Sequence, residues 1–451
     1  MNSTEKAKPV EITWDLSDLY ASPEDPAIAA DWGHSTTWAK DFEARHKGHD
    51  IAALSPEIFL QAIQEYEVIQ EEGLKPFLYA SLLFSEDTQN QQYKTLMQRA
   101  KERWNELENQ LLFFRLTLID LPEEGLQKFL QAEPLKAYGH ALTFLRRLRE
   151  FTQGEKEEEI LSRKNMTGKS AFITLFDEYT GSFIFRLTVD GEEKELTGSE
   201  MLAFLYSPDR KLRESAFRLF LDYHRENHLV LASIFNALIL DARVEDTIRG
   251  YKDPMQQSLL ENEIGRETVD LMMQVTEAHY PLAQEYFQAK ACLLGLSKLK
   301  NSDLYAPLPG LQKKFSFAQT QDLLLKSFHQ FHPLFGEIAG EFIEKRWVDA
   351  AIRKGKAGGA FCAGLTPPLH PYLLMNFTGH LRDALTLAHE MGHGIHFYLA
   401  RKQTLLNFDP SLLLAETASV FGEMVMIQAL LQEETDLAAR QALLAIEIED
   451  I

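Results

Sequence analysis

Two histidines and a glutamate within residues 387–396 have the spacing of a metal-binding helix. The segment contains the pattern His-Glu-x-x-His, in which His389 and His393 lie four residues apart. Residues four apart share one face of a helix, so both imidazoles can reach a single ion. Zn²⁺ accepts imidazole nitrogens at about 2.0–2.1 Å in a tetrahedral shell, and Glu390 beside them can take a proton from a zinc-bound water. The pattern therefore predicts a site for one zinc ion, with Glu390 as the general base.

The helix that carries this pattern is amphipathic. Its apolar residues recur in steps of four and form one stripe, from which the two histidines point away: Leu387, Met391, Ile395 and Leu399. The alternative is an ordinary exposed helix turn with polar side chains. The apolar run of residues 384–388 speaks against this alternative, because unpaired polar groups in an apolar setting would cost free energy that a metal ion offsets.

A zinc site also needs a third protein ligand and one open position. Glu416 follows the apolar run Leu412–Ala415, far enough after His393 for a helix end, a loop and a second helix. Glu423 comes two helical turns later, so it shares a face with Glu416 and could accept the remaining N–H of a ligating imidazole. The alternative for Glu416 is an acid near a helix N-terminus, where the helix dipole favours it.

Other polar residues near the pattern are weaker candidates. His396 is three residues after His393 and is expected to support the site rather than to bind the metal, because three histidines on one helix cannot comfortably share a tetrahedral ion. Asp383 could orient a group of the site. His370 and His380 flank a predicted strand, where they either contact substrate or are ordinary loop histidines.

Further segments with characteristic patterns are spread over nearly the whole chain. They are Trp14–Tyr20, Tyr206–Arg210, Leu304–Leu308, Gly358–Cys362, Pro371–Gly379, Leu381–Asp383 and the Glu-x-x-Ser segment Glu416–Ser419. Together with the His-Glu-x-x-His helix, they resemble the oligoendopeptidase F branch of the M3 zinc metallopeptidases.

The resemblance implies both a fold and an activity. In this family the two pattern histidines and the Glu-x-x-Ser glutamate bind zinc, which maps the ligands onto His389, His393 and Glu416, and the general base onto Glu390. It implies a mainly α protein with two lobes around a deep channel, and a zinc metalloendopeptidase that cleaves short, unstructured oligopeptides. We expect an N-terminal helical lobe over residues 1–197 and a catalytic lobe over residues 198–451.

The end of the chain leaves the activity open. Members of this family continue further and carry His and Tyr residues that grip the substrate and polarise the scissile carbonyl. Residues 423–451 contain no Gly or Pro, so we expect the chain to be truncated inside a helical region. The alternatives are therefore a catalytically impaired fragment that binds zinc and peptide, or a helical scaffold without metal.

The amino-acid composition limits the classes of binding partner and indicates the cellular compartment. The net charge of −21 argues against nucleic acid and against anionic membrane surfaces, because both are bound through basic patches. Two cysteines in 451 residues fit a reducing compartment, most simply the cytoplasm. Cys362, between Phe361 and Ala363, is expected to be a buried small side chain. The N-terminal residues 1–8 show no secretory signal, and no uninterrupted apolar run reaches membrane length. The oligomeric state and the cleavage preference stay open.

Local patterns predict the remaining elements. Residues 1–30 read as an extended arm and residues 35–160 as helices. Phe183–Leu196 reads as a β-hairpin turning at Asp190-Gly191, which could mark the boundary between the lobes. Tyr372–Phe377 reads as a short strand before the zinc helix, with Thr378 as its N-cap. Its edge either receives a substrate strand or pairs only within the protein.

Overall fold

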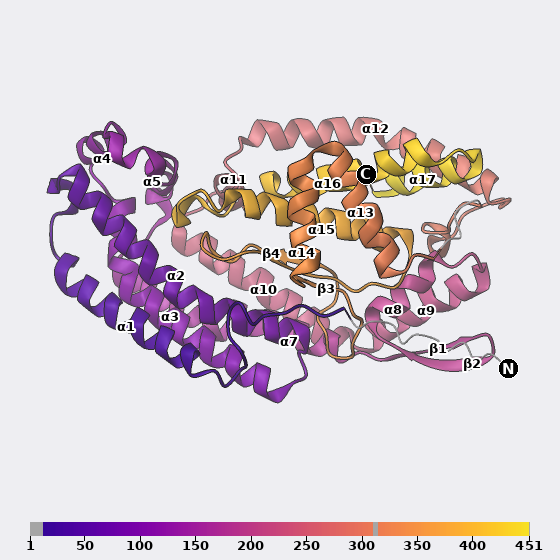
Figure 1. Ribbon diagram of the computed structural model, residues 1–451, viewed down its shortest axis with the longest axis horizontal. Helices are drawn as coiled ribbons and strands as arrows, with labels where there is room; N and C mark the ends of the chain where they lie inside the picture. The colour runs from indigo at the N-terminus through magenta and orange to yellow at the C-terminus, as the bar shows by residue number, and fades with distance from the viewer. Residues whose placement is uncertain (1–11, 310–313, 451) are drawn as a thin grey trace.

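The computed structural model describes residues 12–309 and 314–450, and helices dominate it (Figure 1). The helices of the first part of the chain are α1 (Pro26–His46), α2 (Pro56–Glu86), α3 (Gln91–Ile119), α4 (Glu123–Leu130), α5 (Gly139–Arg147), α6 (Glu155–Thr167) and α7 (Lys169–Gly181). Those of the second part are α8 (Gly198–Ala203), α9 (Arg210–Glu226), α10 (His228–Arg249), α11 (Gln256–Glu261), α12 (Arg266–Leu293), α13 (Phe317–Phe331), α14 (Pro333–Glu344), α15 (Leu381–Ala400), α16 (Leu412–Glu433) and α17 (Leu437–Asp450). The prediction of a mainly α protein is confirmed.

Two large hydrophobic clusters underlie the two-lobed arrangement. One joins α1 to α5 around stacked and edge-to-face rings, among them Phe42, Phe59, Phe114 and Phe129, and occupies the indigo and purple end in Figure 1. The other surrounds α15 and combines residues of α13, α14 and α16 with Trp14 and Tyr20 of the N-terminal segment. The helix predicted to hold the metal thus lies in the second core, where Leu387, Met391 and Ile395 of its apolar stripe are buried and Leu399 is partly buried.

The predicted hairpin is present as β1 (Phe185–Val189) and β2 (Glu192–Leu196), which pair antiparallel. Asp190 and Gly191 both have positive φ, 54° and 84°, as a two-residue turn between right-twisted strands requires. Aspartate tolerates this conformation better than most residues and glycine has no steric penalty there, which explains why this dipeptide marks the turn.

A three-stranded sheet lies against α15 and corrects one expectation. Its strands are β3 (Val348–Asp349), β4 (Phe361–Ala363) and β5 (Tyr372–Leu374), in the order β3-β5-β4. The predicted strand at 372–377 is therefore shorter, and it has no free edge, because β3 pairs with one side in parallel and β4 with the other antiparallel. The outer strand of the described sheet next to α15 is β4, which is half-buried.

The start of α15 also differs from the prediction. The N-cap is His380 rather than Thr378, and Asp383 organises the turn. One carboxylate oxygen of Asp383 accepts hydrogen bonds from the Thr378 amide at 2.7 Å, the Thr378 hydroxyl at 2.8 Å and the His380 amide at 3.0 Å. Asp383 was expected to orient a group of the site. It lies at the helix N-terminus, where it satisfies amides that a helix leaves unpaired.

The two helices that carry the candidate ligands cross at glycines. A Cβ atom on Gly392 of α15 would lie 2.8 Å from the Ser419 Cα and would overlap the Ala418 carbonyl oxygen. A Cβ atom on Gly422 of α16 would overlap the carbonyl oxygen of Ala388. Both positions exclude a side chain, and the resulting close approach brings the backbone of α16 against the face of α15 that carries the histidines.

Among the described residues, α16 is the helix that is long and apolar enough by itself to cross a membrane. The bent pair α9 and α10 would pass the same test together, with a 68° angle between them. Core helices of soluble proteins also pass, and α16 packs along α15 with Ser419, Gly422 and Met426 buried.

Candidate metal centre

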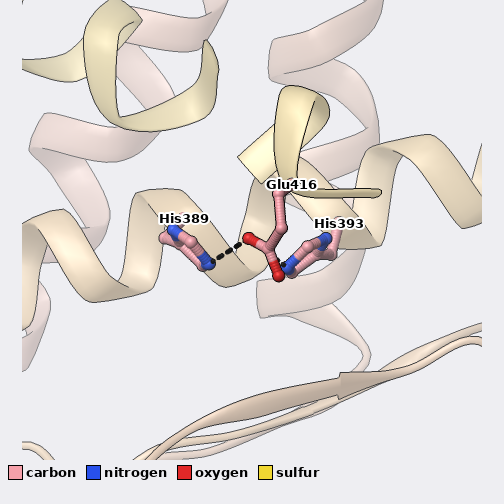
Figure 2. A group of neighbouring side chains, drawn as sticks. All are labelled: His389, His393 and Glu416. Carbon is pink, nitrogen blue, oxygen red and sulfur yellow. Dashed lines mark ion pairs between the residues drawn. The ribbon is translucent and has the colours of Figure 1, made fainter. Parts of the chain in front are cut away.

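His389, His393 and Glu416 converge on one point (Figure 2). The Oε2 atom of Glu416 lies 3.4 Å from Nε2 of His389 and 3.8 Å from Nε2 of His393. The three ligand atoms lie within 4.8 Å of one another. The two imidazoles come from adjacent turns of α15 and the carboxylate from the first half of α16, so folding brings together residues separated in the sequence.

This donor set fits a zinc ion. Tetrahedral bonds of about 2.0–2.1 Å place neighbouring ligand atoms roughly 3.3 Å apart, close to the separations between Glu416 and the two imidazoles. Three ligands leave one position open, which is the arrangement of catalytic rather than structural zinc sites. The set of two imidazoles and one carboxylate also matches the ligand types that zinc prefers.

Two further contacts hold the candidate ligand side chains. The Nδ1 atom of His389 lies 2.5 Å from a carboxylate oxygen of Glu423, the residue that follows Gly422 at the α15–α16 crossing. A carboxylate at that nitrogen fixes the tautomer that leaves Nε2 free to bind a metal. The buried hydroxyl of Ser419 donates to Oε2 of Glu416 at 2.8 Å, so it orients the candidate carboxylate ligand from within its own helix.

Glu390 is the buried acid of the centre. Its side chain is 6% exposed, and its Oε2 atom has no hydrogen-bond partner among the residues that the structure describes. Burial raises the pKa of Glu390 to about 7, and the nearby carboxylates of Glu416 and Glu423 add to that effect. An acid with this pKa can both accept and return a proton near neutral pH.

The same surroundings act on the two imidazoles in opposite directions. Burial alone would lower the pKa of His389, but its contact with Glu423 and the neighbouring carboxylates raise the pKa overall. Burial and the adjacent His389 lower the pKa of His393. A neutral imidazole is the form that binds a metal, so His393 is predisposed to coordinate.

The centre opens into a cavity of about 690 Å³. His389, Glu390 and Glu423 line one side of it. Its remaining wall includes residues far away in the sequence, among them Tyr206, Tyr305, Ala360, His380 and Arg382. A cavity of this size, with a few converging polar groups in a largely apolar lining, is typical of a binding site for a small molecule or a peptide segment.

The other polar residues singled out near the pattern lie at different places in the structure. His380 lines the cavity, whereas His370 stacks on Trp347 at 3.6 Å between ring centroids and pairs with Asp18 at 3.0 Å. His396 lies one turn after His393, and its Nδ1 atom is buried without a hydrogen-bond partner among the described residues. Asp383 also lines the cavity, and neither it nor His396 is among the three side chains that could hold a metal ion, so a supporting role for both stays a prediction.

Cys362 lies in the edge strand β4. Burial and the Glu390 carboxylate raise the pKa of its thiol well above the ordinary value. A thiol that resists deprotonation is a poor nucleophile. Cys362 was expected to be buried; it is partly buried and packs against the hydrophobic cluster around α15.

Sequence reasoning missed several residues of the site. Gly392 and Gly422 were not singled out, although glycines at the centre of two neighbouring helices are a signal of close packing. Ser419 was noted only as part of a pattern, and its spacing of three from Glu416 is the available signal of a contact. Nothing in the local sequence connects Tyr206 or Tyr305 with the metal centre.

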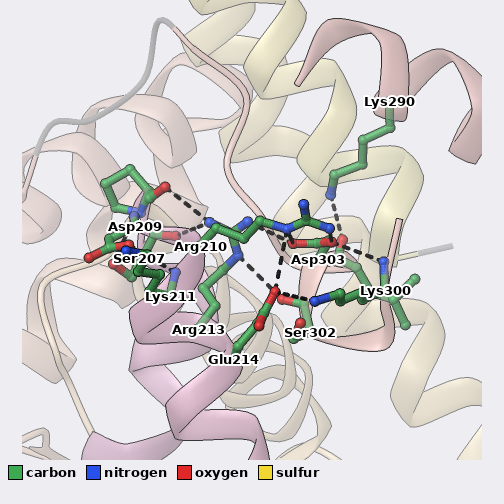
Figure 3. Close-up of polar contacts among 12 residues, drawn as sticks. Ser207, Asp209, Arg210, Lys211, Arg213, Glu214, Lys290, Lys300, Ser302 and Asp303 are labelled. Atoms are coloured by element: carbon green, nitrogen blue, oxygen red, sulfur yellow. Dashed lines mark hydrogen bonds and ion pairs between the residues drawn. The ribbon is translucent and has the colours of Figure 1, made fainter. Parts of the chain in front are cut away.

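A buried cluster of charges holds the loops that carry these two tyrosines (Figure 3). Asp303 is fully buried and accepts hydrogen bonds from Arg210 at 2.6 Å, from Arg213 at 2.9 Å and from the Lys300 amide at 2.9 Å. Arg213 in turn donates to the Ser207 carbonyl oxygen at 2.7 Å. The cluster therefore fastens the segment before α9 to the segment that follows α12.

Asp303→Ala is expected to lower the free energy of unfolding by about 3–5 kcal/mol, because it leaves Arg213 buried without its anion. Burial alone would raise the pKa of Asp303, but the hydrogen bonds from Arg210, Lys300 and Arg213 lower it to about 2. In the unfolded chain the pKa of this aspartate is about 4. The ionised Asp303 therefore stabilises the fold fully above about pH 4, and this stabilisation is lost as the pH falls toward 2. Urea denaturation at pH 7 and below pH 4 measures both effects.

Asp222→Ala is the matched control, since Asp222 forms an exposed pair with Arg225 on α9. Exposed pairs contribute less than about 1 kcal/mol. If the two variants lose the same stability at pH 7, Asp303 does not anchor these loops.

Comparisons with known proteins agree with this geometry. A family model described as Peptidase family M3 matches residues 203–451, more than half of the chain, and a model described as Oligopeptidase F matches residues 118–185. Oligopeptidase PepF of Bacillus subtilis is 26% identical over 440 residues, covering 94% of this chain and 63% of the relative. Group B oligopeptidase PepB of Streptococcus agalactiae is 26% identical, covering 96% of this chain and 71% of the relative. The chain thus spans somewhat under two thirds of the first relative and about seven tenths of the second.

Solved structures share the fold. Oligoendopeptidase-F from Enterococcus faecium superposes with a TM-score of 0.66 at 21% identity, covering 94% of this chain and 70% of that one. A structure described as PZ peptidase A with an inhibitor superposes with a TM-score of 0.74 at 17% identity, covering 94% of this chain and 71% of that one. At these identities the likeness concerns the fold alone.

Proposed function

The chain belongs to peptidase family M3, and from this premise we propose that it is a zinc-dependent endopeptidase that hydrolyses internal bonds of short, unstructured peptides. The observation that carries the proposal is the convergence of His389, His393 and Glu416 beside the buried carboxylate of Glu390, at the wall of an open cavity. The relatives named as oligopeptidases support peptides as the class of substrate.

His389, His393 and Glu416 would hold the ion, and Glu390 would carry the proton. A bound zinc ion supplies a lowered pKa for an attacking water and polarisation of the peptide carbonyl. The carboxylate of Glu390, which lines the cavity, accepts the proton of the attacking water and delivers it to the leaving nitrogen. Glu423 keeps a proton on Nδ1 of His389, so that Nε2 stays available to the metal.

The substrate would lie along the sheet that flanks α15. Gly359 and Ala360 line the cavity and lead directly into β4, whose outer edge is unpaired within the described sheet. An extended peptide can pair with such an edge through its main chain, which positions the scissile bond without reading every side chain. This mode of binding fits unfolded peptides of varied sequence.

The amino-acid composition bears on the cellular compartment and on the partners of this activity. We propose a cytoplasmic enzyme, since two free cysteines suit a reducing compartment, and one that binds neither nucleic acid nor anionic membranes, since the net charge is −21. An acidic surface favours basic peptides by long-range attraction that salt weakens.

A metal-dependent cleavage assay tests the proposal. We expect the purified 451-residue chain to cleave an internally quenched peptide of about ten residues, to lose this activity after dialysis against a chelator, and to regain it with about one equivalent of Zn²⁺. Mass spectrometry of the products distinguishes internal cleavage from trimming of the ends. Stoichiometric zinc and peptide binding without cleavage would favour a catalytically impaired binding fragment, and a chain that binds no metal would contradict both.

A further inference from the structure

Two segments without a role in the chemistry meet beside the metal centre. They are residues 206–210 and 304–308, and each contributes one tyrosine. The rings of Tyr206 and Tyr305 lie 5.2 Å apart between centroids, inclined at 39°. Tyr206 also faces the imidazole of His380 at 6.4 Å and the guanidinium of Arg382 at 5.6 Å. The two rings therefore form one continuous aromatic surface next to the N-terminus of α15.

This aromatic surface lines the same cavity as the proposed catalytic groups. Tyr206, Tyr305, His389 and Glu390 all bound the space of about 690 Å³. Tyr305 is 40% exposed, so much of its ring is left for a ligand. The lining around the pair is extended by small and apolar side chains: Leu202, Ala203, Leu205, Ala360 and Val420. An apolar region of the cavity beside the polar catalytic groups is suited to a hydrophobic side chain.

The pair is held in place by the Asp303 cluster. Asp303 lies two residues before Tyr305, and its partner Arg210 lies four residues after Tyr206. Arg213 also bonds to the Ser207 carbonyl oxygen, immediately after Tyr206. The Lys290 ammonium group donates to the Leu304 carbonyl oxygen, immediately before Tyr305. The chain segments next to both tyrosines are therefore held by these contacts, which lowers the entropic cost of binding a ligand against the two rings.

We propose that Tyr206 and Tyr305 form a side-chain subsite that selects a large apolar residue, aromatic or branched aliphatic, next to the bond that is cleaved. The inference rests on the proposed peptidase function and extends it from main-chain binding to side-chain selection. Aromatic rings contact other rings and aliphatic groups favourably, whereas a small side chain leaves the surface uncovered and a charged one loses its hydration there.

Matched peptides measure this selection. One set of quenched peptides varies only the residue before the cleaved bond, and a second set varies only the residue after it, each with Phe, Leu, Ala or Asp. We expect one set to be cleaved with kcat/KM at least about tenfold higher for Phe or Leu than for Ala, and lower still for Asp. Tyr305→Ala should reduce the Phe-to-Ala ratio about tenfold, while Tyr305→Phe should preserve most of it.

Tyr280→Ala is the control, because Tyr280 is an exposed tyrosine on α12, at 54% exposure, that does not line this cavity. Its Phe-to-Ala ratio should equal that of the wild type. Each ratio is taken within one variant, so a general loss of activity cancels. A Phe-to-Ala ratio that is unchanged in Tyr305→Ala and in Tyr206→Ala would overturn the subsite.

A second readout separates this inference from the proposed function. Fluorescence anisotropy with labelled peptides of both sets measures equilibrium affinity on the zinc-loaded chain, and Glu390→Gln prevents turnover during the measurement. If no peptide is cleaved but Phe peptides bind at least about tenfold tighter than Ala peptides and lose this preference in Tyr305→Ala, catalysis fails and the subsite stands. Equal affinity for the Phe and Ala peptides would refute the subsite whether or not the chain cleaves them.

Discussion

Glu390→Gln is expected to retain zinc and to lose peptide hydrolysis by a factor of about 10²–10⁴, the range that a positioned general base contributes. Glutamine has nearly the same shape as glutamate, so the buried position stays filled and the ligands His389 and His393 keep their places on α15. It cannot accept a proton at neutral pH. The loss should therefore fall on kcat, with little change in peptide affinity, because the carboxylate acts on the attacking water.

Steady-state kinetics with a quenched peptide, together with metal analysis of the same preparation, measure this prediction. Glu434→Gln is the matched control, since it makes the same chemical change at a residue after the end of α16, outside the lining of the cavity. Equal turnover by the wild type and Glu390→Gln would remove Glu390 from the mechanism. Loss of zinc in Glu390→Gln would instead assign it a structural role.

Gly422→Ala is expected to weaken zinc binding by at least tenfold and to destabilise the fold by about 1–3 kcal/mol. The added Cβ atom would overlap the Ala388 carbonyl oxygen and lie 3.3 Å from the Gly392 Cα, so α16 must move away from α15. Glu416 and Glu423 both belong to α16 and would shift with it. The variant therefore separates Glu416 from the two histidines without altering any ligand.

Competition with a zinc-binding dye gives the affinity, and thermal unfolding of the metal-free chain gives the stability. Gly33→Ala is the control, because Gly33 lies within the helix α1 and a Cβ atom there meets nothing within 4 Å. Alanine is the better helix former, so this variant should be as stable as the wild type or more stable. Unchanged zinc affinity in Gly422→Ala would show that the close crossing does not position the ligands.

The helical class, the hairpin and the members of the candidate ligand group could be predicted from local patterns in the sequence. A two-residue hairpin turn needs positive φ, which Asp-Gly favours, and both Asp190 and Gly191 have positive φ in the structure. His389 and His393 share a helical face through spacing alone, so their proximity needs no tertiary information. Glu416 could be selected because it follows an apolar run at a suitable distance, and the structure places it next to both imidazoles.

Features that depend on long-range packing could not be predicted from the sequence. Tyr372–Phe377 looked like an edge strand, but the neighbour on one side, β3, comes from Val348–Asp349, and no local pattern specifies that pairing. Thr378 is a better N-cap by type than His380, but the helix begins later because Asp383 binds the amides of both residues. The meeting of Tyr206 with Tyr305 depends on a buried aspartate between two arginines, which is visible only in three dimensions.

The central claim is that one zinc ion is bound by two imidazoles and one carboxylate. X-ray absorption at the zinc edge, on a preparation of known metal content, tests it most directly. We expect one zinc per chain, with two nitrogen ligands and one carboxylate ligand at about 2.0–2.2 Å, and the loss of one oxygen ligand in Glu416→Ala. A zinc content near zero, or a coordination shell that is the same in the wild type and in Glu416→Ala, would contradict the account.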